Sequence, residues 1–209
     1  DTADRFVAEL APKVRSLKIG QYDEPGVEMG PVVTADAKAR IVDYINQGES
    51  DGASVVVDGR GLSLQGYEKG FFVGGTLLDH VTPSMSVYRD EIFGPVLSVL
   101  RPQSFTDAVD LVMAHEYGNG TAIFTRDGDA AREFANKVNV GMVGVNVPIP
   151  VPVAYHSFGG WKASMFGDHA IHGMEGVRFY TKLKTVTARW PSGIKDGAVF
   201  NFHSGSETK

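Results

Sequence analysis

The chain is organised around the stretch YRDEIFGPVLSVL, residues 88–100. Two acidic residues lead into an aromatic residue, a Gly-Pro pair and a run with strand character. Gly94 permits unusual backbone angles, while Pro95 fixes its own φ and biases the residue before it away from helical angles. We therefore expect Glu91 and Phe93 to lie on a stiff turn before a buried strand, where a loop can hold a side chain over a pocket.

Glu91 has two possible roles on such a turn. Its carboxylate can accept hydrogen bonds from both hydroxyls of a ribose. It can instead form an ion pair with a nearby arginine such as Arg89. The local sequence by itself favours the ion pair.

Composition limits the classes of protein to consider. With 209 residues, of which 43% are hydrophobic, the chain can bury the core of one ordinary domain, or of one domain with an appendage. A formal charge of -5 argues against nucleic acid or an anionic membrane surface as a partner. No apolar run reaches the length of a membrane span, and the first residues are acidic, unlike a signal peptide. We expect a soluble protein of the cytoplasm, or of the mitochondrial matrix in a eukaryote.

The chain contains no cysteine. This excludes disulfides, zinc–thiolate sites and a cysteine nucleophile within these residues. The sequence also begins with Asp1 and enters a helical pattern at once, so we expect it to be a piece of a longer protein.

Helical and strand patterns alternate along most of the chain. Helices are expected over 3–17, 35–47, 105–116 and 130–138, and strands over 54–57, 70–78, 96–100, 121–125 and 141–146. Thr34 and Ser104 are suitable N-caps, and the segment DGD at 127–129 should cap the helix over 130–138. Pro12 should kink or shorten the first helix, and Gly48 should end the second. Such alternation implies βαβ crossovers, so the fold class is α/β with a mostly parallel sheet.

The last third of the chain has a different character. Residues 147–157 contain three prolines and cannot be regular, and they end in FGGWK, residues 158–162. A stiff loop of this kind can be the wall of a substrate channel or an ordinary surface loop. Residues 176–190 alternate polar and apolar side chains, which predicts a half-exposed strand that needs a partner edge.

Several common site types are not predicted. Asp168, His169 and His172 are close in sequence, but no other residues with ligand spacing accompany them, so no metal site is expected. The sequence has neither a P-loop lysine motif nor a G-x-G-x-x-G fingerprint. It also lacks a G-x-S-x-G elbow, which argues against a serine hydrolase.

Several motifs taken together resemble the NAD(P)-dependent aldehyde dehydrogenase superfamily. The segment EIFGPV, residues 91–96, is similar to a motif of that superfamily, as are MGP at 29–31, GFFV at 70–73 and FGG at 158–160. After the FGG, the chain departs from common members. The segments FGD at 166–168, HG at 172–173 and VRFYT at 177–181 instead resemble the methylmalonate-semialdehyde dehydrogenase family, which includes malonate-semialdehyde dehydrogenases. The resemblance covers about residues 1–190.

The resemblance implies an architecture. Residues 1–176 would form the major part of an aldehyde dehydrogenase catalytic domain, a layered, mostly parallel sheet with flanking helices. Residues 177–190 would be an oligomerisation strand that joins copies of the enzyme into a homo-oligomer, and residues 191–209 a C-terminal tail.

The resemblance also implies a reaction. In this family a cysteine thiolate attacks the semialdehyde, hydride passes to NAD, and the thioester is transferred to coenzyme A with loss of carbon dioxide. Glu91 would bind the nicotinamide ribose, Phe93 would lie beside the nicotinamide, and Phe158 would line the substrate funnel. The cysteine and most of the NAD domain lie upstream in family members, so this chain would hold no catalytic residue and would be inactive without that N-terminal part. Two alternatives are an ordinary non-acylating aldehyde dehydrogenase and a non-catalytic assembly module.

Overall fold

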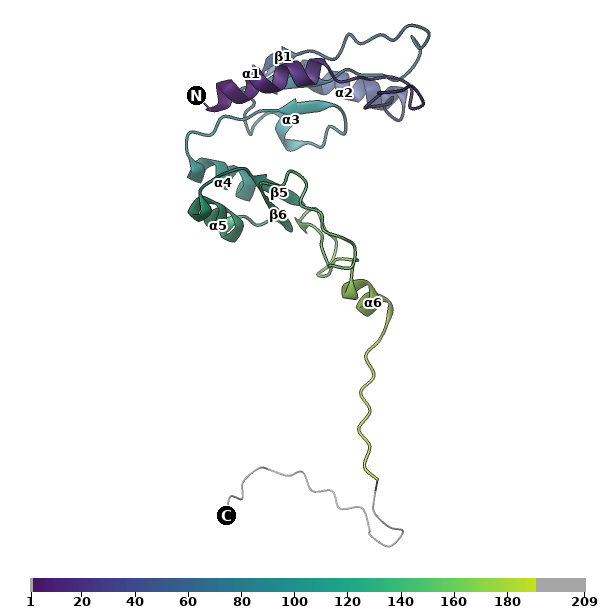
Figure 1. Ribbon diagram of the computed structural model, residues 1–209, viewed down its shortest axis with the longest axis vertical. Helices are drawn as coiled ribbons and strands as arrows, with labels where there is room; N and C mark the ends of the chain where they lie inside the picture. Colours follow the sequence, from purple (N-terminus) through teal and green to yellow (C-terminus); the bar gives the residue numbers. More distant parts are fainter. Residues whose placement is uncertain (1, 191–209) are drawn as a thin grey trace.

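A computed structural model describes residues 2–190 of the chain. Figure 1 shows a first layered unit near the N-terminus, a second one built on α4 and α5, and a segment that runs away from both after α6. The helices of the described residues are α1 (Thr2–Arg15), α2 (Ala35–Ser50), α3 (Ser86–Arg89), α4 (Phe105–Ala114), α5 (Gly128–Lys137) and α6 (Met174–Tyr180). The strands are β1 (Ser54–Val57), β2 (Thr76–Asp79), β3 (Val96–Ser98), β4 (Tyr117–Gly118), β5 (Gly120–Ile123), β6 (Met142–Val145) and β7 (Trp161–Lys162).

The first unit is a three-stranded sheet with one long helix on each face. β2 lies in the centre, pairs antiparallel with β1 and parallel with β3, and is buried along its whole length. Successive side chains of a strand point to opposite faces. Leu77 accordingly packs with Val7 and Ala11 of α1, whereas Leu78 packs with Ile41 of α2. The central strand thus joins two hydrophobic clusters into one layered α/β unit.

The second unit contains a parallel pair of strands and a small antiparallel pair. β5 and β6 run parallel and are connected through α5, which is the crossover that the sequence predicts. Val109 of α4 and Phe134 of α5 are buried together with Val138 and Val140. β4 pairs antiparallel with β7. The predicted α/β class is confirmed, with both parallel and antiparallel ladders in the described residues.

Three helices begin where the sequence predicts a capping side chain. The Ala37 amide donates to the Thr34 hydroxyl at 3.1 Å, and the Asp107 amide donates to Ser104 at 3.1 Å. Asp127 accepts hydrogen bonds from the first amides of α5. These side chains satisfy amide groups that have no partner inside the helix.

One predicted helix end is wrong, because α2 continues past Gly48 to Ser50. α1 contains Pro12 and ends at Arg15, earlier than the predicted end at residue 17. Gly48 is buried, and a Cβ atom there would lie 3.0 Å from Val87 and 3.2 Å from Leu78. The glycine therefore serves close packing of α2 against the sheet rather than helix termination.

The predicted strand over residues 70–78 begins later than expected, at Thr76. The preceding residues are buried in part, but their backbone bonds go to loops. The Val32 amide donates to the Phe71 carbonyl, and the Gly74 amide donates to the Gly59 carbonyl. Because no strand of the described chain lies alongside them, residues 70–75 form an irregular segment that leads into β2.

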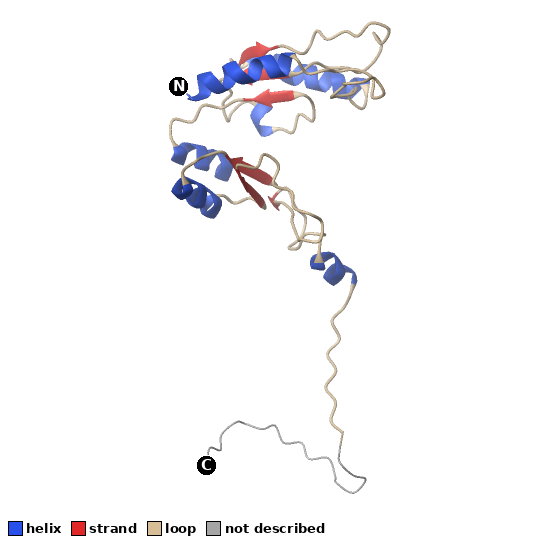
Figure 2. Cartoon of the chain, viewed as in Figure 1, coloured by secondary structure: helices blue, strands red, loops and turns tan. Residues whose placement is uncertain are grey.

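The predicted strand over 177–190 is wrong at its start, because residues 177–180 belong to α6. Glu175 and Arg178 form an ion pair one helical turn apart, which favours helix there. Residues 181–190 run extended, and Figure 2 shows no strand beside them in the described chain. A strand needs a neighbouring edge for its amides and carbonyls, and the part of the chain that is described offers none here. The expected tail, 191–209, lies outside the described residues.

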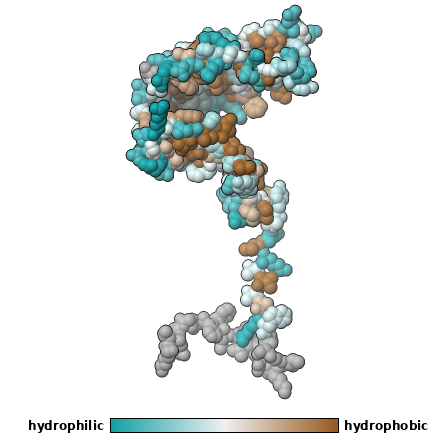
Figure 3. All heavy atoms as spheres, in the orientation of Figure 1, coloured by the Kyte–Doolittle hydropathy of each residue, from teal (hydrophilic) through white to brown (hydrophobic). Residues whose placement is uncertain are grey.

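Large apolar side chains are exposed along this last third of the chain. Figure 3 shows brown residues over the second unit and single ones along the extended segment. The exposed set includes Ile149, Val153, Tyr155, Phe166, Ile171, Phe179, Tyr180, Leu183, Val186 and Trp190.

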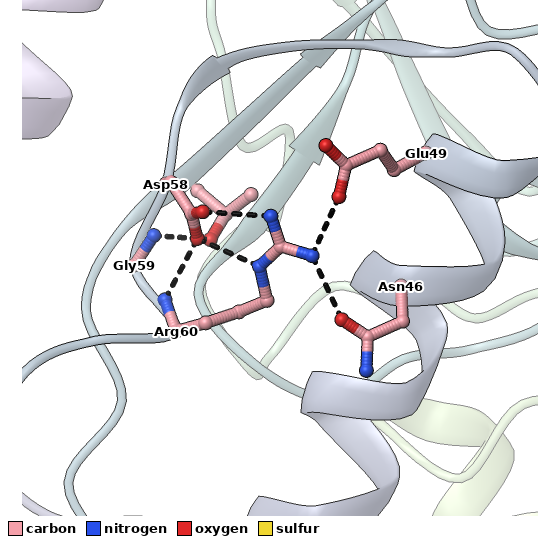
Figure 4. Close-up of polar contacts among 6 residues, drawn as sticks. Asn46, Glu49, Asp58, Gly59 and Arg60 are labelled. Carbon is pink, nitrogen blue, oxygen red and sulfur yellow. Dashed lines mark hydrogen bonds and ion pairs between the residues drawn. The ribbon is translucent and has the colours of Figure 1, made fainter.

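Two arginine clamps join elements that are distant in sequence. Figure 4 shows the Arg60 guanidinium bound to Asp58 and to two residues of α2, Asn46 and Glu49, and each of these hydrogen bonds is 2.7–2.9 Å long. The hydrogen bonds that Arg60 donates to Asp58 hold the pKa of the Asp58 carboxyl below its usual value. The clamp fixes the loop after β1 onto α2.

The second clamp centres on Arg101. Its guanidinium donates to both carboxylate oxygens of Asp79 at 3.0 and 2.7 Å and to Asp4 of α1 at 2.6 Å. Asp79 is only 4% exposed. The hydrogen bonds from Arg101 lower the pKa of the Asp79 carboxyl, and a bond from the His80 amide acts in the same direction. The clamp therefore ties α1, β2 and the segment after β3 together.

Among the described residues, no helix combines the length and the apolar character that a membrane span requires.

Candidate cofactor and substrate site

Glu91 and Phe93 lie on the turn between α3 and β3, as the sequence predicts. Ile92, between them, is buried in the cluster under α2, so the two flanking side chains face outward. The Arg40 guanidinium donates to the Glu91 carbonyl at 3.4 Å, and the Thr76 amide donates to the Pro95 carbonyl at 2.8 Å. The turn is therefore attached to α2 on one side and to β2 on the other.

The unusual backbone angle of this turn falls on Phe93, not on Gly94. Phe93 has a φ of +52°, in the left-handed region that is costly for a residue with a side chain. A Cβ atom at Gly94 would lie 2.6 Å from Cδ1 of Ile41, so the glycine is needed for the close approach of the turn to α2. Backbone strain of this kind is frequent at binding sites. The expectation that Gly94 supplies the angle is therefore corrected.

Glu91 lies at the border of two open pockets. One pocket, of about 530 Å³, is lined by the turn itself and by the neighbouring residues Val87, Val96 and Ser98. The other, of about 460 Å³, is lined by Glu91 together with Tyr88, His115, Tyr117 and Ser164. Both volumes lie in the range of small-molecule sites.

The Glu91 carboxylate is exposed and keeps its acceptor capacity. Within residues 2–190 it forms no ion pair, and Arg89 does not pair with it. The Phe93 ring beside it is 75% exposed. A carboxylate acceptor next to an open aromatic face fits the ribose and nicotinamide end of a dinucleotide. The carboxylate acceptor and the aromatic ring thus fit that part of NAD.

Phe158 lies elsewhere, in the loop between β6 and β7. Its half-buried ring stacks on His172, with centroids 4.1 Å apart and planes at 15°. It does not line either pocket that contains Glu91. The described residues therefore bring Glu91 and Phe93 together on one turn and place Phe158 outside both pockets.

The histidines near this loop have protein partners of their own. His169 lies 3.4 Å from the Glu175 carboxylate, and His172 stacks on Phe158. No group of three or more His, Cys, Asp or Glu side chains gathers for a metal ion in the described part of the chain. His169 and His172 thus each contact a residue of the same chain, Glu175 and Phe158 respectively.

Three residues that position the site were not predicted from sequence. The Tyr44 hydroxyl donates to Asp90 at 3.1 Å, directly before Glu91. Lys162, two residues after the FGG, donates to the carbonyls of Val112, Met113 and His115 at 2.9–3.1 Å and so caps the end of α4. His115 is the third, and its contacts are described below. A lysine or histidine has no sequence pattern that announces such contacts, because they join segments far apart in the chain.

The family profile described as "Aldehyde dehydrogenase family" matches residues 1–186. The chain belongs to this family. Its turn at Glu91 and its FGG loop are thus parts of an aldehyde dehydrogenase.

Individual aldehyde dehydrogenases with high similarity carry more specific names. The chain is 58% identical over 189 residues to the malonate-semialdehyde dehydrogenase of Pseudomonas aeruginosa, which covers 90% of this chain and 38% of the relative. It is 46% identical over 188 residues to the acylating, mitochondrial methylmalonate-semialdehyde/malonate-semialdehyde dehydrogenase of Bos taurus, covering 90% of this chain and 35% of the relative.

Solved structures give the same picture. A protein from Sinorhizobium meliloti described as a methylmalonate-semialdehyde dehydrogenase, solved in complex with NAD, superposes with a TM-score of 0.90 at 60% identity. The match covers 93% of this chain and 40% of that chain. The methylmalonate-semialdehyde dehydrogenase of Oceanimonas doudoroffii gives a TM-score of 0.87 at 57% identity, covering 91% and 39%. The aldehyde dehydrogenase fold is therefore shown, and the chain spans about 40% of the length of these relatives.

Proposed function

We propose that this chain is the C-terminal portion of an NAD-dependent, coenzyme A-acylating dehydrogenase of malonate or methylmalonate semialdehyde. The observation that carries the proposal is the identity of 58–60% with relatives named malonate- or methylmalonate-semialdehyde dehydrogenase, over at least 90% of the chain. The acylating reaction is taken from the name of the Bos taurus relative, which is 46% identical. The intact enzyme would oxidise the semialdehyde to a thioester, lose carbon dioxide and release acetyl- or propionyl-coenzyme A.

Glu91 and Phe93 are the residues that we assign to cofactor positioning. The carboxylate of Glu91, free of ion pairs in residues 2–190, accepts hydrogen bonds from the two ribose hydroxyls. The exposed ring of Phe93 flanks the nicotinamide, which accepts the hydride when NAD is bound. Positioning of this kind acts through geometry, because small displacements of reacting groups cost large factors in rate. The NAD in the Sinorhizobium meliloti structure supports this choice of cofactor.

Phe158 is assigned to the wall of the substrate path. Its stack on His172 holds the ring in one orientation, and an aromatic wall excludes water from the reacting aldehyde. The proline-rich loop before it limits how far the ring can move.

The chemistry of bond formation is assigned to residues outside this chain. The sequence has no cysteine to supply the thiolate, and the relatives are more than twice as long. We therefore propose that the 209-residue chain is inactive alone and acts with the remaining N-terminal part of the enzyme. Residues 181–190, which run extended and form no strand ladder in the described chain, are the proposed site where copies of the enzyme associate. The location would be the cytoplasm, or the mitochondrion in a eukaryote, as in the name of the Bos taurus relative.

A product assay tests the proposal. The purified chain is compared with a complete enzyme in which it replaces the corresponding segment of the Pseudomonas aeruginosa relative. Each receives malonate or methylmalonate semialdehyde with NAD, with and without coenzyme A. We expect no NADH from the chain alone, and both NADH and an acyl-coenzyme A from the complete enzyme. Turnover by the chain alone would refute the assignment of the nucleophile.

The same assay separates the acylating reaction from the ordinary one. Formation of the free acid at an undiminished rate without coenzyme A would identify a non-acylating aldehyde dehydrogenase instead. Failure of the complete enzyme to oxidise either semialdehyde, although it is folded and binds NAD, would leave only the role of a non-catalytic assembly module.

A further inference from the structure

His115 connects the two parts of the chain that carry the predicted site residues. It is half-buried directly after α4. Its ring stands between two tyrosines, with centroids 5.1 Å from Tyr88 and 5.8 Å from Tyr117. It also lines the pocket of about 460 Å³ that contains Glu91.

The hydrogen bonds of the ring define its tautomer. The backbone amide of Tyr117 lies 3.1 Å from Nδ1 of His115. A backbone N–H can only donate, so Nδ1 is the acceptor and carries no proton. The proton of the neutral ring is then on Nε2, which lies 3.2 Å from the Tyr88 carbonyl and donates to it. The imidazole thus donates to the Tyr88 carbonyl through Nε2 and accepts from the Tyr117 amide through Nδ1.

The backbone of the same residue reaches the substrate-side loop. The His115 carbonyl accepts a hydrogen bond from the Lys162 ammonium at 3.0 Å. Lys162 follows Phe158 by four residues and lies in β7, which pairs with β4. Tyr88, at the other end of the bridge, precedes Glu91 by three residues.

We propose that His115 is a positioning residue that fixes the Glu91 turn relative to the Phe158 loop. The inference rests on the proposed role of Glu91 in holding the cofactor. The contact at Nε2 restrains Tyr88 at the end of α3, a helix of only four residues. Loss of that contact removes one restraint on the segment before the turn, while the hydrogen bonds from Arg40 to the Glu91 carbonyl and from the Tyr88 hydroxyl to the Leu111 carbonyl remain.

Two substitutions separate the contacts of the ring. In His115→Asn the side-chain oxygen takes the place of Nδ1 and still accepts from the Tyr117 amide, but the side chain is too short for the Tyr88 carbonyl. In His115→Gln the amide nitrogen takes the place of Nε2 and can donate to Tyr88. Neither substitution alters the backbone carbonyl that binds Lys162. His115→Asn thus keeps the Tyr117 contact and loses the Tyr88 contact, whereas His115→Gln keeps the Tyr88 contact and loses the Tyr117 contact.

Both variants are made in the complete enzyme and measured in three ways: single-turnover NADH formation, NAD affinity by calorimetry, and thermal midpoint. We expect His115→Asn to slow hydride transfer and weaken NAD binding by about five- to tenfold each, because the turn loses one of its restraints and small displacements of the cofactor are costly. His115→Gln should stay within about twofold of the unsubstituted enzyme, because it keeps the bond to Tyr88.

The inference is overturned if His115→Asn behaves as the unsubstituted enzyme in both rate and affinity. It is also overturned if His115→Gln is impaired as strongly as His115→Asn, because the ring would then matter only for local packing. Glu91→Gln is measured alongside. If that variant is impaired and His115→Asn is not, only the His115 inference fails, whereas a fully active Glu91→Gln contradicts the proposed function itself.

Discussion

The close contact between Gly94 and Ile41 lets the Glu91 turn pack against α2, and the substitution Gly94→Ala, which adds one methyl group, tests this contact. In Gly94→Ala the new Cβ would lie 2.6, 2.8 and 3.1 Å from Cδ1, Cγ1 and Cγ2 of Ile41. Ile41 is fully buried and cannot withdraw toward solvent. Forcing an extra methyl group into a packed core costs about 1–3 kcal/mol, and we expect this loss of stability.

A double-mutant cycle assigns the loss to this contact. Ile41→Val removes Cδ1, the nearest of the three atoms, and by itself should cost about 0.5–1.5 kcal/mol. In the double variant the worst overlap is absent, so the combined loss should fall below the sum of the single losses by about 0.5 kcal/mol or more. Simple additivity would mean that the two residues do not interact.

The assay is urea unfolding of the purified chain, with Gly61→Ala as the matched control. A Cβ atom at Gly61 meets no other atom within 4 Å, so that change should stay within about 0.5 kcal/mol of the unsubstituted chain. Equal stability of Gly94→Ala and Gly61→Ala would refute the packing argument. Hydride transfer by Gly94→Ala in the complete enzyme should fall as well, since the turn is displaced.

Three further predictions concern the two arginine clamps and the hydrogen bonds of Lys162. The hydrogen bonds from Arg101 lower the pKa of Asp79, so the contribution of the Asp79 carboxylate to stability is complete above its ordinary pKa of 3.8 and is lost as the pH falls through the lower pKa of the folded state. Below about pH 4, the free energy of unfolding of Asp79→Asn should therefore depend less on pH than that of the unsubstituted chain. An equal pH dependence in the two proteins would contradict this. Arg60→Met should cost only about 1 kcal/mol, because Asp58 and Glu49 are half-exposed, and the difference from the unsubstituted chain should shrink at high salt. Lys162→Met leaves three carbonyls at the end of α4 without their donor and should lower the free energy of unfolding by about 1–3 kcal/mol. A loss under about 0.5 kcal/mol would contradict this and would show that water replaces the ammonium group.

Local features of the fold could be predicted from the sequence because they depend on neighbouring residues. The capping side chains Thr34, Ser104 and Asp127 act within their own helices, and β1 has the predicted bounds of 54–57. The turn at Glu91 could likewise be placed, because a Gly-Pro pair before an apolar run constrains the backbone directly.

Features that depend on distant residues could not be predicted. Gly48 suggests a helix end locally, but its real constraint is the approach of Val87 and Leu78. The alternating pattern after residue 176 resembles a strand, yet a strand forms only beside another edge, and the described residues place α6 at its start. The contacts of Lys162 with the end of α4 accompany the pairing of β4 with β7, which no pattern within either two-residue strand indicates, and the contact of His115 with Tyr88 joins residues 27 positions apart.

The central claim is that Glu91 holds the sugar of the cofactor for hydride transfer, and Glu91→Gln in the complete enzyme tests it most directly. Single-turnover NADH formation is measured with saturating semialdehyde, and Glu9→Gln, an exposed glutamate on α1, is the control. The account predicts that Glu91→Gln slows hydride transfer by about one to two orders of magnitude, or about 1.4–3 kcal/mol, while the control is unchanged. A rate of hydride transfer in Glu91→Gln equal to that of the unsubstituted enzyme would contradict it.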